Sequence, residues 1–293
     1  MSSTSPPLVD TPTTLASTNS SGFNAPVLAA VAAIENVAPH HFLFKLHAPA
    51  IAHRAQAGQF VHILPKVGLE TDPFLRRAFS IMAVEGEHIE VLFRVEGRGT
   101  TQIAKARVGQ ALDILGPLGR PFDLAPFHVK QNVPQPILVG GGVGVPPMVF
   151  LAKTLIGQGI KPTVLVGARG ESDVLGDEHF NALGIQPSVA TDDGSRGHAG
   201  RVTELLETSL KTQQQAVVYA CGPLPMLRAV AHVARRFDVP CQVSMEENMP
   251  CGIGVCNGCV VAMRETATDY ERYRRICIHG PAVWAHEIDW ENL

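Results

Sequence analysis

Four cysteines between residues 251 and 277 constrain this chain more than any other feature. The first three are spaced C-x4-C-x2-C and the fourth follows after seventeen residues: Cys251, Cys256, Cys259 and Cys277. This is the plant-type spacing of the thiolates that hold a [2Fe-2S] cluster. Gly252, Gly254 and Gly258 let the loop curl so that backbone N–H groups reach the sulfurs. The spacing therefore predicts a [2Fe-2S] cluster with these four cysteines as its metal ligands.

The same cysteines could instead hold a structural zinc ion or form a disulfide pair. Zinc sites usually arrange their cysteines as two C-x2-C knuckles or include histidine. This stretch has one C-x2-C, and the other two cysteines stand four and seventeen residues away. The pattern favours the cluster, with zinc and a disulfide as alternatives.

Composition narrows the remaining possibilities. The chain has 293 residues, a formal net charge of -3 and 45% hydrophobic residues, which predicts two or three domains with substantial cores. The weak negative charge argues against a nucleic-acid or anionic-membrane surface. No run of eighteen apolar residues occurs, so no membrane span is expected, and cysteines gathered in one motif favour a cytoplasmic location. Residues 1–25, rich in Ser, Thr and Pro, are expected to be a disordered tail and not a signal peptide.

The pattern of expected secondary structure divides the chain into an all-β part and a part in which strands and helices alternate. Residues 26–130 carry short β-rich runs separated by Gly and Pro turns, with one short helix over residues 101–106, which predicts an antiparallel β-barrel. The expected strands cover residues 41–48, 58–65, 79–84, 88–95 and 111–119.

Residues 134–243 alternate strands with helices, which predicts βαβ units around a parallel sheet. The expected strands cover residues 137–140, 162–168, 187–191, 216–221 and, as the final strand, 241–245. Residues 244–293 would form a small cluster domain stabilised largely by its metal and its docking surface. The expected fold class is therefore α+β multidomain, with a barrel, a central α/β nucleotide domain and a C-terminal [2Fe-2S] domain.

A glycine-rich turn opens the second domain. Gly141, Gly142 and Gly144 lie between an expected strand and an expected helix, where backbone N–H groups can face a pyrophosphate. Pro147 stands where the third glycine of G-x-G-x-x-G would be, so a plain structural turn is the alternative. The surrounding βαβ pattern favours nucleotide binding.

Cys221 and Gly222 end the fourth strand of that sheet. Ligands in open α/β sheets gather at the carboxyl ends of strands, and a small thiol beside a glycine would let a flat ring approach. The alternative is that Cys221 is a buried, small apolar side chain.

Two stretches of the first domain are further candidate binding sites. Arg77 and Ser80, within RRAFSI, can hold phosphate or flavin oxygens through hydrogen bonds. Gly99 and Thr100 enter a short helix and form a second candidate pyrophosphate site. An arginine pair alone is usually solvated, but two such stretches ahead of a nucleotide domain favour binding.

The order of these motifs resembles a known family. The motifs are RRAFSI, EGRGT, GGGVGVPP, ACGPLPML, EENMPCGIGVCNGC and ERYRRICIHGP. They are similar to those of ferredoxin-reductase-like flavoproteins and, more closely, of the electron-transfer subunit of NAD-dependent dihydroorotate dehydrogenase (type B). The resemblance covers residues 26–290, and its C-terminal part is the most specific because plain ferredoxin reductases lack a cluster there. Ala78 departs from the family, where proline is common.

The resemblance implies a role for each matched residue. The FAD ring and ribityl chain would contact Arg77, Ala78, Phe79 and Ser80, and the middle of the flavin would contact Phe93, Arg94 and Val95. The FAD pyrophosphate would be held by Gly99 and Thr100. NAD would be held by Gly141, Gly142 and Gly144, with Cys221 and Gly222 near the nicotinamide. No catalytic residue is assigned beyond Cys221 as a candidate there.

The implied function is electron transfer in pyrimidine biosynthesis. An FMN-containing catalytic subunit would oxidise dihydroorotate, and this oxidoreductase subunit would pass electrons through the cluster and FAD to NAD+. The expected assembly is a heterotetramer with two copies of each chain, in which this chain does not bind the pyrimidine. A single arginine after the second strand of the sheet, Arg169, favours NAD over NADP.

Two other interpretations stay open. An NAD(P)H-dependent reductase subunit could use the same sites to feed a hydrogenase, a sulfite reductase or an oxygenase, and its partner would distinguish it. A zinc-bearing, nucleotide-binding regulator without redox turnover would leave the arginines of the barrel without a use.

Overall fold

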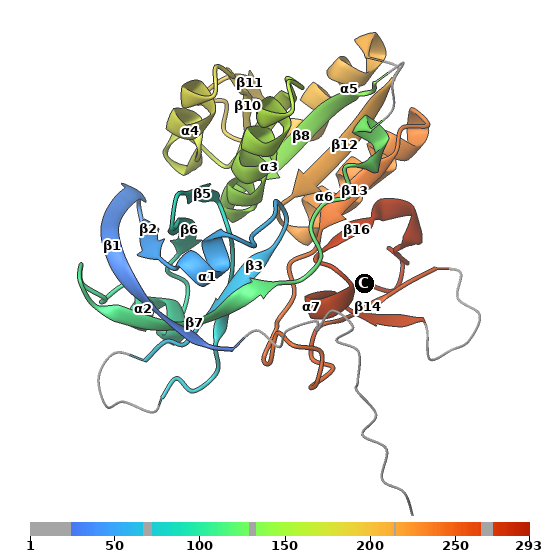
Figure 1. Ribbon diagram of the computed structural model, residues 1–293. Coiled ribbons are helices and arrows are strands. Elements are labelled where there is room, and N and C mark those ends of the chain that lie inside the picture. The colour runs from blue at the N-terminus through green and yellow to red at the C-terminus, as the bar shows by residue number, and fades with distance from the viewer. Residues whose placement is uncertain (1–24, 67–71, 129–132, 214, 265–271) are drawn as a thin grey trace, which may run out of the picture.

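The computed structural model describes residues 25–66, 72–128, 133–213, 215–264 and 272–293 (Figure 1). The expected disordered tail lies outside these ranges except for Ala25, and so does the expected domain boundary at residue 130. An N-terminal antiparallel sheet, a central sheet with helices on both faces and a C-terminal segment between them make up the described structure.

The N-terminal sheet holds the expected strands, with two differences: β1 is additional, and the strand expected over residues 79–84 is divided into β4 and β5. Within the described residues its strand order is β4-β3-β7-β1-β2-β6-β5. The strands are β1 (Val27–Ala38), β2 (His41–His47), β3 (Phe60–Ile63), β4 (Arg77–Ser80), β5 (Ala83–Glu85), β6 (His88–Arg94) and β7 (Ala111–Leu118). Short helical segments connect them: α1 (Pro49–Ala52), α2 (Arg98–Ile103) and, after the last strand, η1 (Ala125–Phe127).

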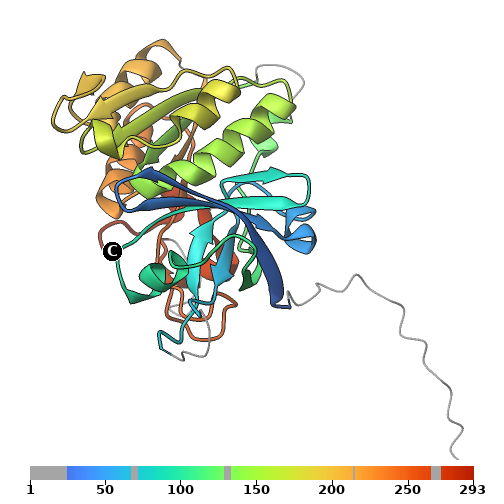
Figure 2. The same ribbon diagram turned by 90° about the vertical axis from the view of Figure 1, so that its left-hand side faces the viewer.

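This sheet curls until its two edge strands follow one another in sequence (Figure 2). β4 and β5 stand at opposite ends of the strand order, yet only Ile81 and Met82 separate them. The Ile81 N–H donates to the Gln59 carbonyl beside β3, and the Met82 N–H donates to the Glu90 carbonyl in β6. The barrel prediction is therefore confirmed. The single strand expected over residues 79–84 is wrong, because the chain turns a corner there and changes its partner strand.

β1 is absent from the sequence-based prediction. Its alanine-rich sequence has weak β-propensity, but it pairs with β2 on one side and with β7 on the other. Long-range pairing therefore decides its conformation. The helix expected over residues 101–106 begins earlier, at Arg98, because the Thr100 hydroxyl accepts the Gly97 N–H at 3.1 Å and starts the turn.

The central sheet has parallel strands with one antiparallel addition. In the described part of the chain its strand order is β11-β10-β9-β8-β12-β13-β16. The strands are β8 (Gln135–Gly141), β9 (Thr163–Ala168), β10 (Ser188–Thr191), β11 (His198–Ala199), β12 (Ala216–Cys221), β13 (Cys241–Ser244) and β16 (Ala282–Trp284). The helical segments are η2 (Gly142–Gly144), α3 (Val145–Gly157), η3 (Glu171–Asp173), α4 (Asp177–Ala182), α5 (Val202–Thr212) and α6 (Leu224–Arg236).

The helices of this domain cover both faces of the sheet (Figure 1). α3 lies between the sheet and the barrel, and Lys153 of α3 donates to the Val84 carbonyl of β5 at 2.9 Å. β8 and β12 are neighbours in the sheet although β9, β10 and β11 lie between them in the chain, so the strand order reverses between them. Such a reversal opens a crevice at the carboxyl ends of the two strands.

The final strand expected over residues 241–245 does not end the sheet. β16, from the C-terminal segment, pairs antiparallel with β13 and sets Val283 opposite Val243. The predicted strand is present as β13, but it is buried along its whole length, and a three-residue strand far along the chain covers its edge. The cluster-bearing segment therefore shares the sheet and core of the nucleotide domain.

The rest of the C-terminal segment packs against the barrel. Its elements are β14 (Val260–Ala262), β15 (Tyr273–Arg275), α7 (Ile276–His279) and η4 (Ala285–Glu287). Cys259 and Cys277 form an apolar cluster with Phe60, Leu115 and Leu118 of β3 and β7. The cluster loop is thus built onto both larger units at once.

The link between barrel and sheet is fixed by hydrogen bonds to one residue. Tyr219 Oη donates to the Asp123 carbonyl at 2.9 Å, and Gln242 Nε2 donates to the same oxygen at 3.0 Å. The Asp123 N–H donates in turn to Gln242 Oε1 at 3.0 Å.

Across the described ranges, no helix combines the length and apolar character that a membrane crossing requires.

Candidate functional site

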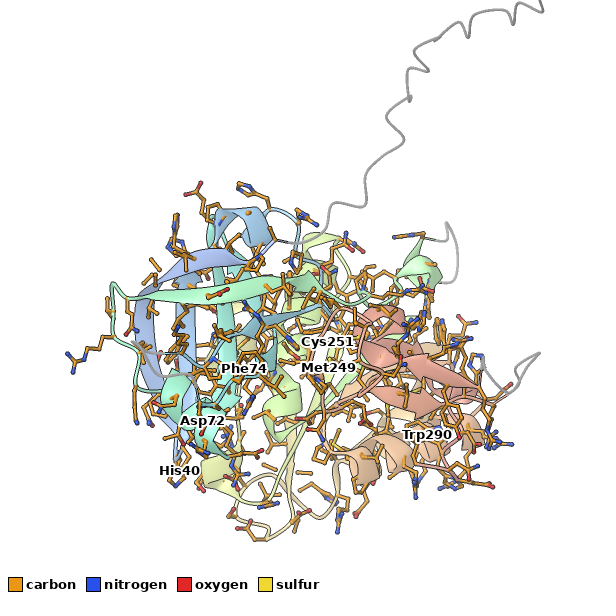
Figure 3. The ribbon with its side chains drawn as sticks, turned by 90° about the horizontal axis from the view of Figure 1, so that it is seen from below. His40, Asp72, Phe74, Met249, Cys251 and Trp290 are labelled. Carbon is orange, nitrogen blue, oxygen red and sulfur yellow. The ribbon has the colours of Figure 1, made fainter. Side chains whose placement is uncertain are left out.

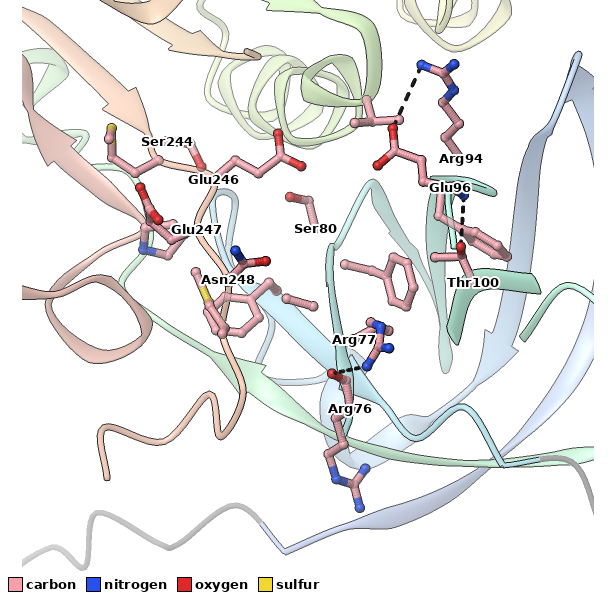
Figure 4. A pocket seen from close by; sticks show the side chains of 18 of the residues that line it. Arg76, Arg77, Ser80, Arg94, Glu96, Thr100, Ser244, Glu246, Glu247 and Asn248 are labelled. Atoms are coloured by element: carbon pink, nitrogen blue, oxygen red, sulfur yellow. Dashed lines mark hydrogen bonds and ion pairs between the residues drawn. The ribbon is translucent and has the colours of Figure 1, made fainter. Parts of the chain in front are cut away.

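A cavity of about 700 Å³ lies where the barrel, the nucleotide domain and the cluster segment meet (Figure 4). Binding sites for cofactors usually measure roughly 300–1,000 Å³. The barrel contributes Arg77, Ala78, Phe79, Ser80, Phe93, Arg94 and Thr100 to its wall. The other units contribute Val143, Cys221, Ser244, Glu246, Glu247, Asn248, Met249 and Pro250. The structure thus brings together most of the barrel residues expected from the sequence.

Arg76, just before β4, and Arg77, the first residue of β4, make different contacts. Arg76 Nη2 donates to Asp113 Oδ1 at 2.8 Å and so ties β4 to β7. Arg77 Nη1 donates to the Leu75 carbonyl at 2.6 Å, and among the described residues its charge has no carboxylate partner. The Arg77 guanidinium lies against Gly99, where an added Cβ would come within 2.5 Å of Arg77 Nε. Arg77 is therefore the cation that this wall offers to an anionic ligand.

The other expected barrel residues divide into lining and supporting positions. Phe79 and Phe93 pack together across the barrel, with ring centroids 5.1 Å apart. Val95 and Gly99 do not line the cavity; the Val95 N–H donates to the His40 carbonyl at 2.8 Å. The Thr100 hydroxyl is used within its own turn, because it accepts the N–H groups of residues 96 and 97.

Sequence reasoning missed an acidic group at the back of the cavity. Figure 4 shows the Glu246 carboxyl facing Ser80 across the open space. Burial, with the nearby carboxylates of Glu96 and Glu247, raises the pKa of Glu246. These residues follow the carboxyl end of β13, so their position at the end of a parallel strand was the signal that could have found them.

Cys221 lies beside this acidic group. Burial and the negative charge of Glu246 raise the pKa of the Cys221 thiol to about 12, while a hydrogen bond with Ser244 acts in the opposite direction. The thiol therefore stays protonated near neutral pH, and its reactivity as a nucleophile is low. Both the buried-apolar interpretation and the ring-facing interpretation are compatible with this position.

The glycine turn and the Cys221 corner meet at the carboxyl ends of β8 and β12. A Cβ added to Gly144 would lie 2.2 Å from the Cys221 carbonyl oxygen, so the two turns touch. Gly142 has φ +53° and an added Cβ would meet nothing within 4 Å, so this residue faces open space. Gly141 and Gly222, the latter with φ +156°, complete the corner. The expected nucleotide residues thus stand together where the strand order reverses.

The ends of the next two strands carry more acid than base. Arg169 follows β9, and the Asp193 N–H donates to its carbonyl oxygen at 3.1 Å. Asp192 Oδ1 lies 3.5 Å from Arg201 Nε. The Ser195 hydroxyl and N–H both donate to Asp193 and lower the pKa of its carboxyl. Two carboxylates therefore stand at the end of β10, next to the strand that Arg169 follows.

A hairpin brings the fourth cysteine of the motif to the other three. β14 and β15 pair antiparallel with Val260 opposite Arg275, and the Ile276 N–H donates to the Cys259 carbonyl at 2.9 Å. Cys277 therefore follows directly beside Cys259. Figure 3 shows Cys251 next to Met249 on the molecular face between the barrel and the C-terminal segment.

The loop directs backbone N–H groups at the cysteine sulfurs. The Val255 and Cys256 N–H groups donate to Cys251 Sγ, each at 3.4 Å. The Gly254 N–H donates to Cys277 Sγ at 3.2 Å. The remaining contacts are from the Gly258 N–H to Cys256 Sγ and from the Cys277 N–H to Cys259 Sγ, both at 3.4 Å.

The three glycines of the loop allow this geometry in different ways. Gly252 and Gly254 have φ of +69° and +80°, which other residues rarely adopt. Gly258 needs no such conformation, but an added Cβ would lie 2.9 Å from Pro250 Cδ. The predicted close approach of N–H groups to the sulfurs is therefore present.

The four thiols form an outer pair, Cys251 with Cys256, and an inner pair, Cys259 with Cys277. Burial alone would raise the pKa of Cys251, but the N–H groups pointing at its sulfur outweigh burial and lower the pKa to about 6. Burial and the adjacent Cys259 thiol raise the pKa of Cys277 to about 12. Cys259 and Cys277 are each 1% exposed, whereas Cys256 is exposed.

Two pairs of thiols fit a cluster of two irons, since each iron takes two thiolates. His62 of β3 lies against Gly252, and within the described residues both its ring nitrogens are buried without a hydrogen-bond partner. The two ring nitrogens of His62 thus lie directly beneath the cluster loop without a hydrogen-bond partner among the described residues.

Comparison with known proteins shows the family of this chain. Residues 246–289 match the family model of the iron-sulfur cluster binding domain of dihydroorotate dehydrogenase B, and residues 138–232 match that of the oxidoreductase NAD-binding domain. The dihydroorotate dehydrogenase B (NAD(+)) electron transfer subunit of Bacillus caldolyticus is 39% identical over 263 residues, which cover 88% of this chain and 96% of that one. This chain belongs to the family of dihydroorotate dehydrogenase B electron transfer subunits. The subunit of Desulforamulus reducens, 36% identical, is covered over 98% of its length.

Solved structures support the same conclusion about the fold. A structure of an NADH-dependent reduced ferredoxin-NADP oxidoreductase, described for flavin-based electron bifurcation, matches with TM-score 0.77 and 27% identity over 94% of this chain and 93% of that one. The ferredoxin reductase of carbazole 1,9a-dioxygenase matches with TM-score 0.61 and 22% identity over 74% of this chain and 66% of that one, which shows a shared fold. The predicted family, the ferredoxin-reductase-like fold class and the oxidoreductase assignment are confirmed.

Proposed function

We propose that this chain passes electrons between an FMN-containing dihydroorotate dehydrogenase catalytic subunit and NAD+ in pyrimidine biosynthesis. The observation that carries the proposal is the shared cavity, since Arg77 and Ser80 of the barrel, Cys221 of the nucleotide domain and Met249 before the cluster all line it. A bound flavin exchanges electrons both in pairs and singly, which is the chemistry needed between a hydride carrier and an iron–sulfur cluster. One space that borders all three sites suits that chemistry.

FAD is the proposed occupant of the cavity. Its contacts would come from Arg77, Ala78, Phe79, Ser80, Phe93 and Arg94, which line the cavity, while Val95 lies outside its wall. Gly99 would act by leaving room for the Arg77 guanidinium, and Thr100 would act by holding the turn that carries Gly99. The charge of Arg77, which has no carboxylate partner among the described residues, supports an anionic ligand at this wall.

NAD is proposed for the corner where β8 and β12 end. Gly141, Gly142 and Gly144 would face its phosphates, and Cys221 with Gly222 would lie near the nicotinamide. The protonated Cys221 thiol would contribute through its small size, which lets the flat nicotinamide ring approach. Glu246, whose carboxyl faces Ser80 and whose pKa is raised by burial, would accept or donate a proton there.

The cluster is proposed for Cys251, Cys256, Cys259 and Cys277. Cys256 is exposed, and the same loop carries two exposed apolar side chains just before it, Ile253 at 49% and Val255 at 73% exposure. This surface supports docking of the catalytic subunit beside the cluster, in a heterotetramer with two copies of each chain. We assign the three sites to domains over residues 26–130, 134–243 and 244–293, and a cytoplasmic location suits thiolate ligands that must stay reduced.

The experiment is reconstitution with and without the catalytic subunit. The proposal predicts that this chain alone reduces artificial electron acceptors with NADH but does not oxidise dihydroorotate. Adding the FMN subunit should give dihydroorotate-dependent reduction of NAD+. Oxidation of dihydroorotate by this chain alone would show that the division of labour is wrong.

An NAD(P)H-dependent reductase subunit that feeds a hydrogenase, sulfite reductase or oxygenase is the second candidate. The match over 94% of the chain to an NADH-dependent reduced ferredoxin-NADP oxidoreductase favours it. Purification of the native complex separates the two, because the companion polypeptide would be a flavin-containing pyrimidine enzyme in one case and a terminal reductase or oxygenase in the other.

A further inference from the structure

Arg275, at the end of β15, reaches the loop that carries the first cysteines. Its Nη1 donates to the Gly254 carbonyl oxygen. The Val255 N–H belongs to the same peptide group as that oxygen, and it donates to Cys251 Sγ at 3.4 Å. A single peptide group therefore has a guanidinium at one end and a cluster ligand at the other.

The charge of Arg275 should act through this peptide. A cation bonded to a carbonyl oxygen polarises the peptide and strengthens donation by its N–H group. Hydrogen bonds to ligand sulfurs withdraw electron density and set the potential of an iron–sulfur cluster. Arg275 has no carboxylate partner among the described residues, whereas its neighbour Arg274 donates to Glu287 at 3.1 Å. The guanidinium of Arg275 is thus directed at the Gly254–Val255 peptide.

The surroundings of the two thiol pairs also favour added negative charge at the outer pair. In the described loop, Cys251 and Cys256 together accept more backbone N–H groups than Cys259 and Cys277 do. The outer pair also borders water, while the inner pair is packed against Phe60 and other apolar side chains of the barrel. Added negative charge is therefore better stabilised at the iron held by the outer pair.

We propose that Arg275 is a positioning residue that, through the Gly254–Val255 peptide, raises the cluster potential and biases the reducing electron toward the iron held by Cys251 and Cys256. The inference deepens the proposed function and rests on the cluster site. Phe60 and Met249 line the cavity and pack against the inner pair. The electron would consequently reside on the side away from the cavity, at the exposed surface proposed for the partner chain.

The first test compares two neighbouring arginines in the full-length chain, loaded with FAD and cluster under anaerobic conditions. Arg275→Gln and Arg274→Gln each remove one positive charge from β15, but Arg275 alone of the two bonds to the cysteine loop. A redox titration followed by EPR should give a more negative cluster midpoint for Arg275→Gln than for Arg274→Gln. Arg275→Lys, which keeps the charge, should fall between Arg275→Gln and wild type. Equal midpoints for the two glutamine variants would overturn the proposal.

The second test needs no variant and covers the case in which Arg275→Gln does not retain its cluster. In the reduced wild-type chain, proton NMR of the cysteine β-protons distinguishes ligands of ferrous iron from ligands of ferric iron. The proposal expects the ferrous pattern on Cys251 and Cys256; the ferrous pattern on Cys259 and Cys277 would overturn it. A wild-type chain without iron would contradict the proposed function itself, which separates the two failures.

Discussion

Gly99 lies directly against the guanidinium of Arg77, so that a Cβ added to Gly99 would come within 2.5 Å of Arg77 Nε. The contact joins the start of β4 to the first turn of α2, two elements that the chain separates by β5 and β6. The glycine is needed here for space, because its φ lies outside the left-handed region. The orientation of the cavity's unpaired cation therefore depends on the absence of a side chain at Gly99.

Gly99→Ala should displace Arg77 and weaken FAD binding. Loss of one charge-assisted hydrogen bond costs about 1.5–3 kcal/mol, which corresponds to a roughly 10- to 100-fold higher Kd. Titration of the flavin-free chain, followed by quenching of flavin fluorescence, measures the change. Gly97→Ala is the matched control, since an added Cβ there meets nothing within 4 Å. Equal Kd values for the two variants would contradict the role of the Gly99–Arg77 contact.

Gly144→Ala should impair NADH binding and leave FAD binding unchanged. The new Cβ would lie 2.2 Å from the Cys221 carbonyl, so one of the two turns at the nucleotide corner must move. The KM for NADH in dye reduction should rise by at least about tenfold. Gly157→Ala, at the end of α3 where an added Cβ meets nothing within 4 Å, should keep the wild-type KM. A Gly144→Ala chain with wild-type KM would show that NADH binds elsewhere.

Asp192→Asn should improve the use of NADPH relative to NADH. The substitution removes one of the two carboxylates at the end of β10 and leaves Arg201 without its partner at 3.5 Å, so repulsion of a 2′-phosphate falls. The ratio of kcat/KM for the two nucleotides is the measurement. Asp238→Asn, beyond α6 at the opposite end of the strands, is the control. If both variants keep the wild-type ratio, Asp192 does not determine specificity.

His62 should make the stability of the chain depend on acidity. Burial, with a smaller effect of Arg76, lowers the pKa of His62 from 6.5 to about 4. The unfolded chain takes up the proton first, so this contribution is present above pH 6.5 and is lost as the pH falls through 4. The full loss is about 3 kcal/mol at about 1.4 kcal/mol per pKa unit.

The measurement is the thermal unfolding midpoint of wild type and His62→Leu between pH 7 and pH 4. The leucine variant should lose less stability over this interval than wild type, since it has no proton to take up. His53→Leu replaces an exposed histidine and should follow wild type. Parallel curves for wild type and His62→Leu would contradict a neutral, buried ring under Gly252.

Local spacing accounts for what the sequence could predict. The cysteine motif, the glycine turn after β8 and most strands are set by residues close together in the chain, and the structure brings the four cysteines together and forms that turn and most of those strands. β16 could not be foreseen, because three residues far from β13 carry too little pattern to mark an edge strand. The seat of His62 beneath Gly252 and the position of Glu246 opposite Ser80 also depend on long-range packing. The motifs of the site could therefore be predicted from the sequence, whereas the long-range contacts that support them could not.

The central claim is that one chain links a hydride carrier to a one-electron centre held by Cys251, Cys256, Cys259 and Cys277. Anaerobic addition of NADH to the isolated full-length chain, followed by low-temperature EPR, tests it most directly. The account predicts bleaching of the flavin absorbance together with the rhombic signal of a reduced [2Fe-2S] cluster, stoichiometric with the chain. Bleaching without that signal, in protein that contains no iron, would contradict it.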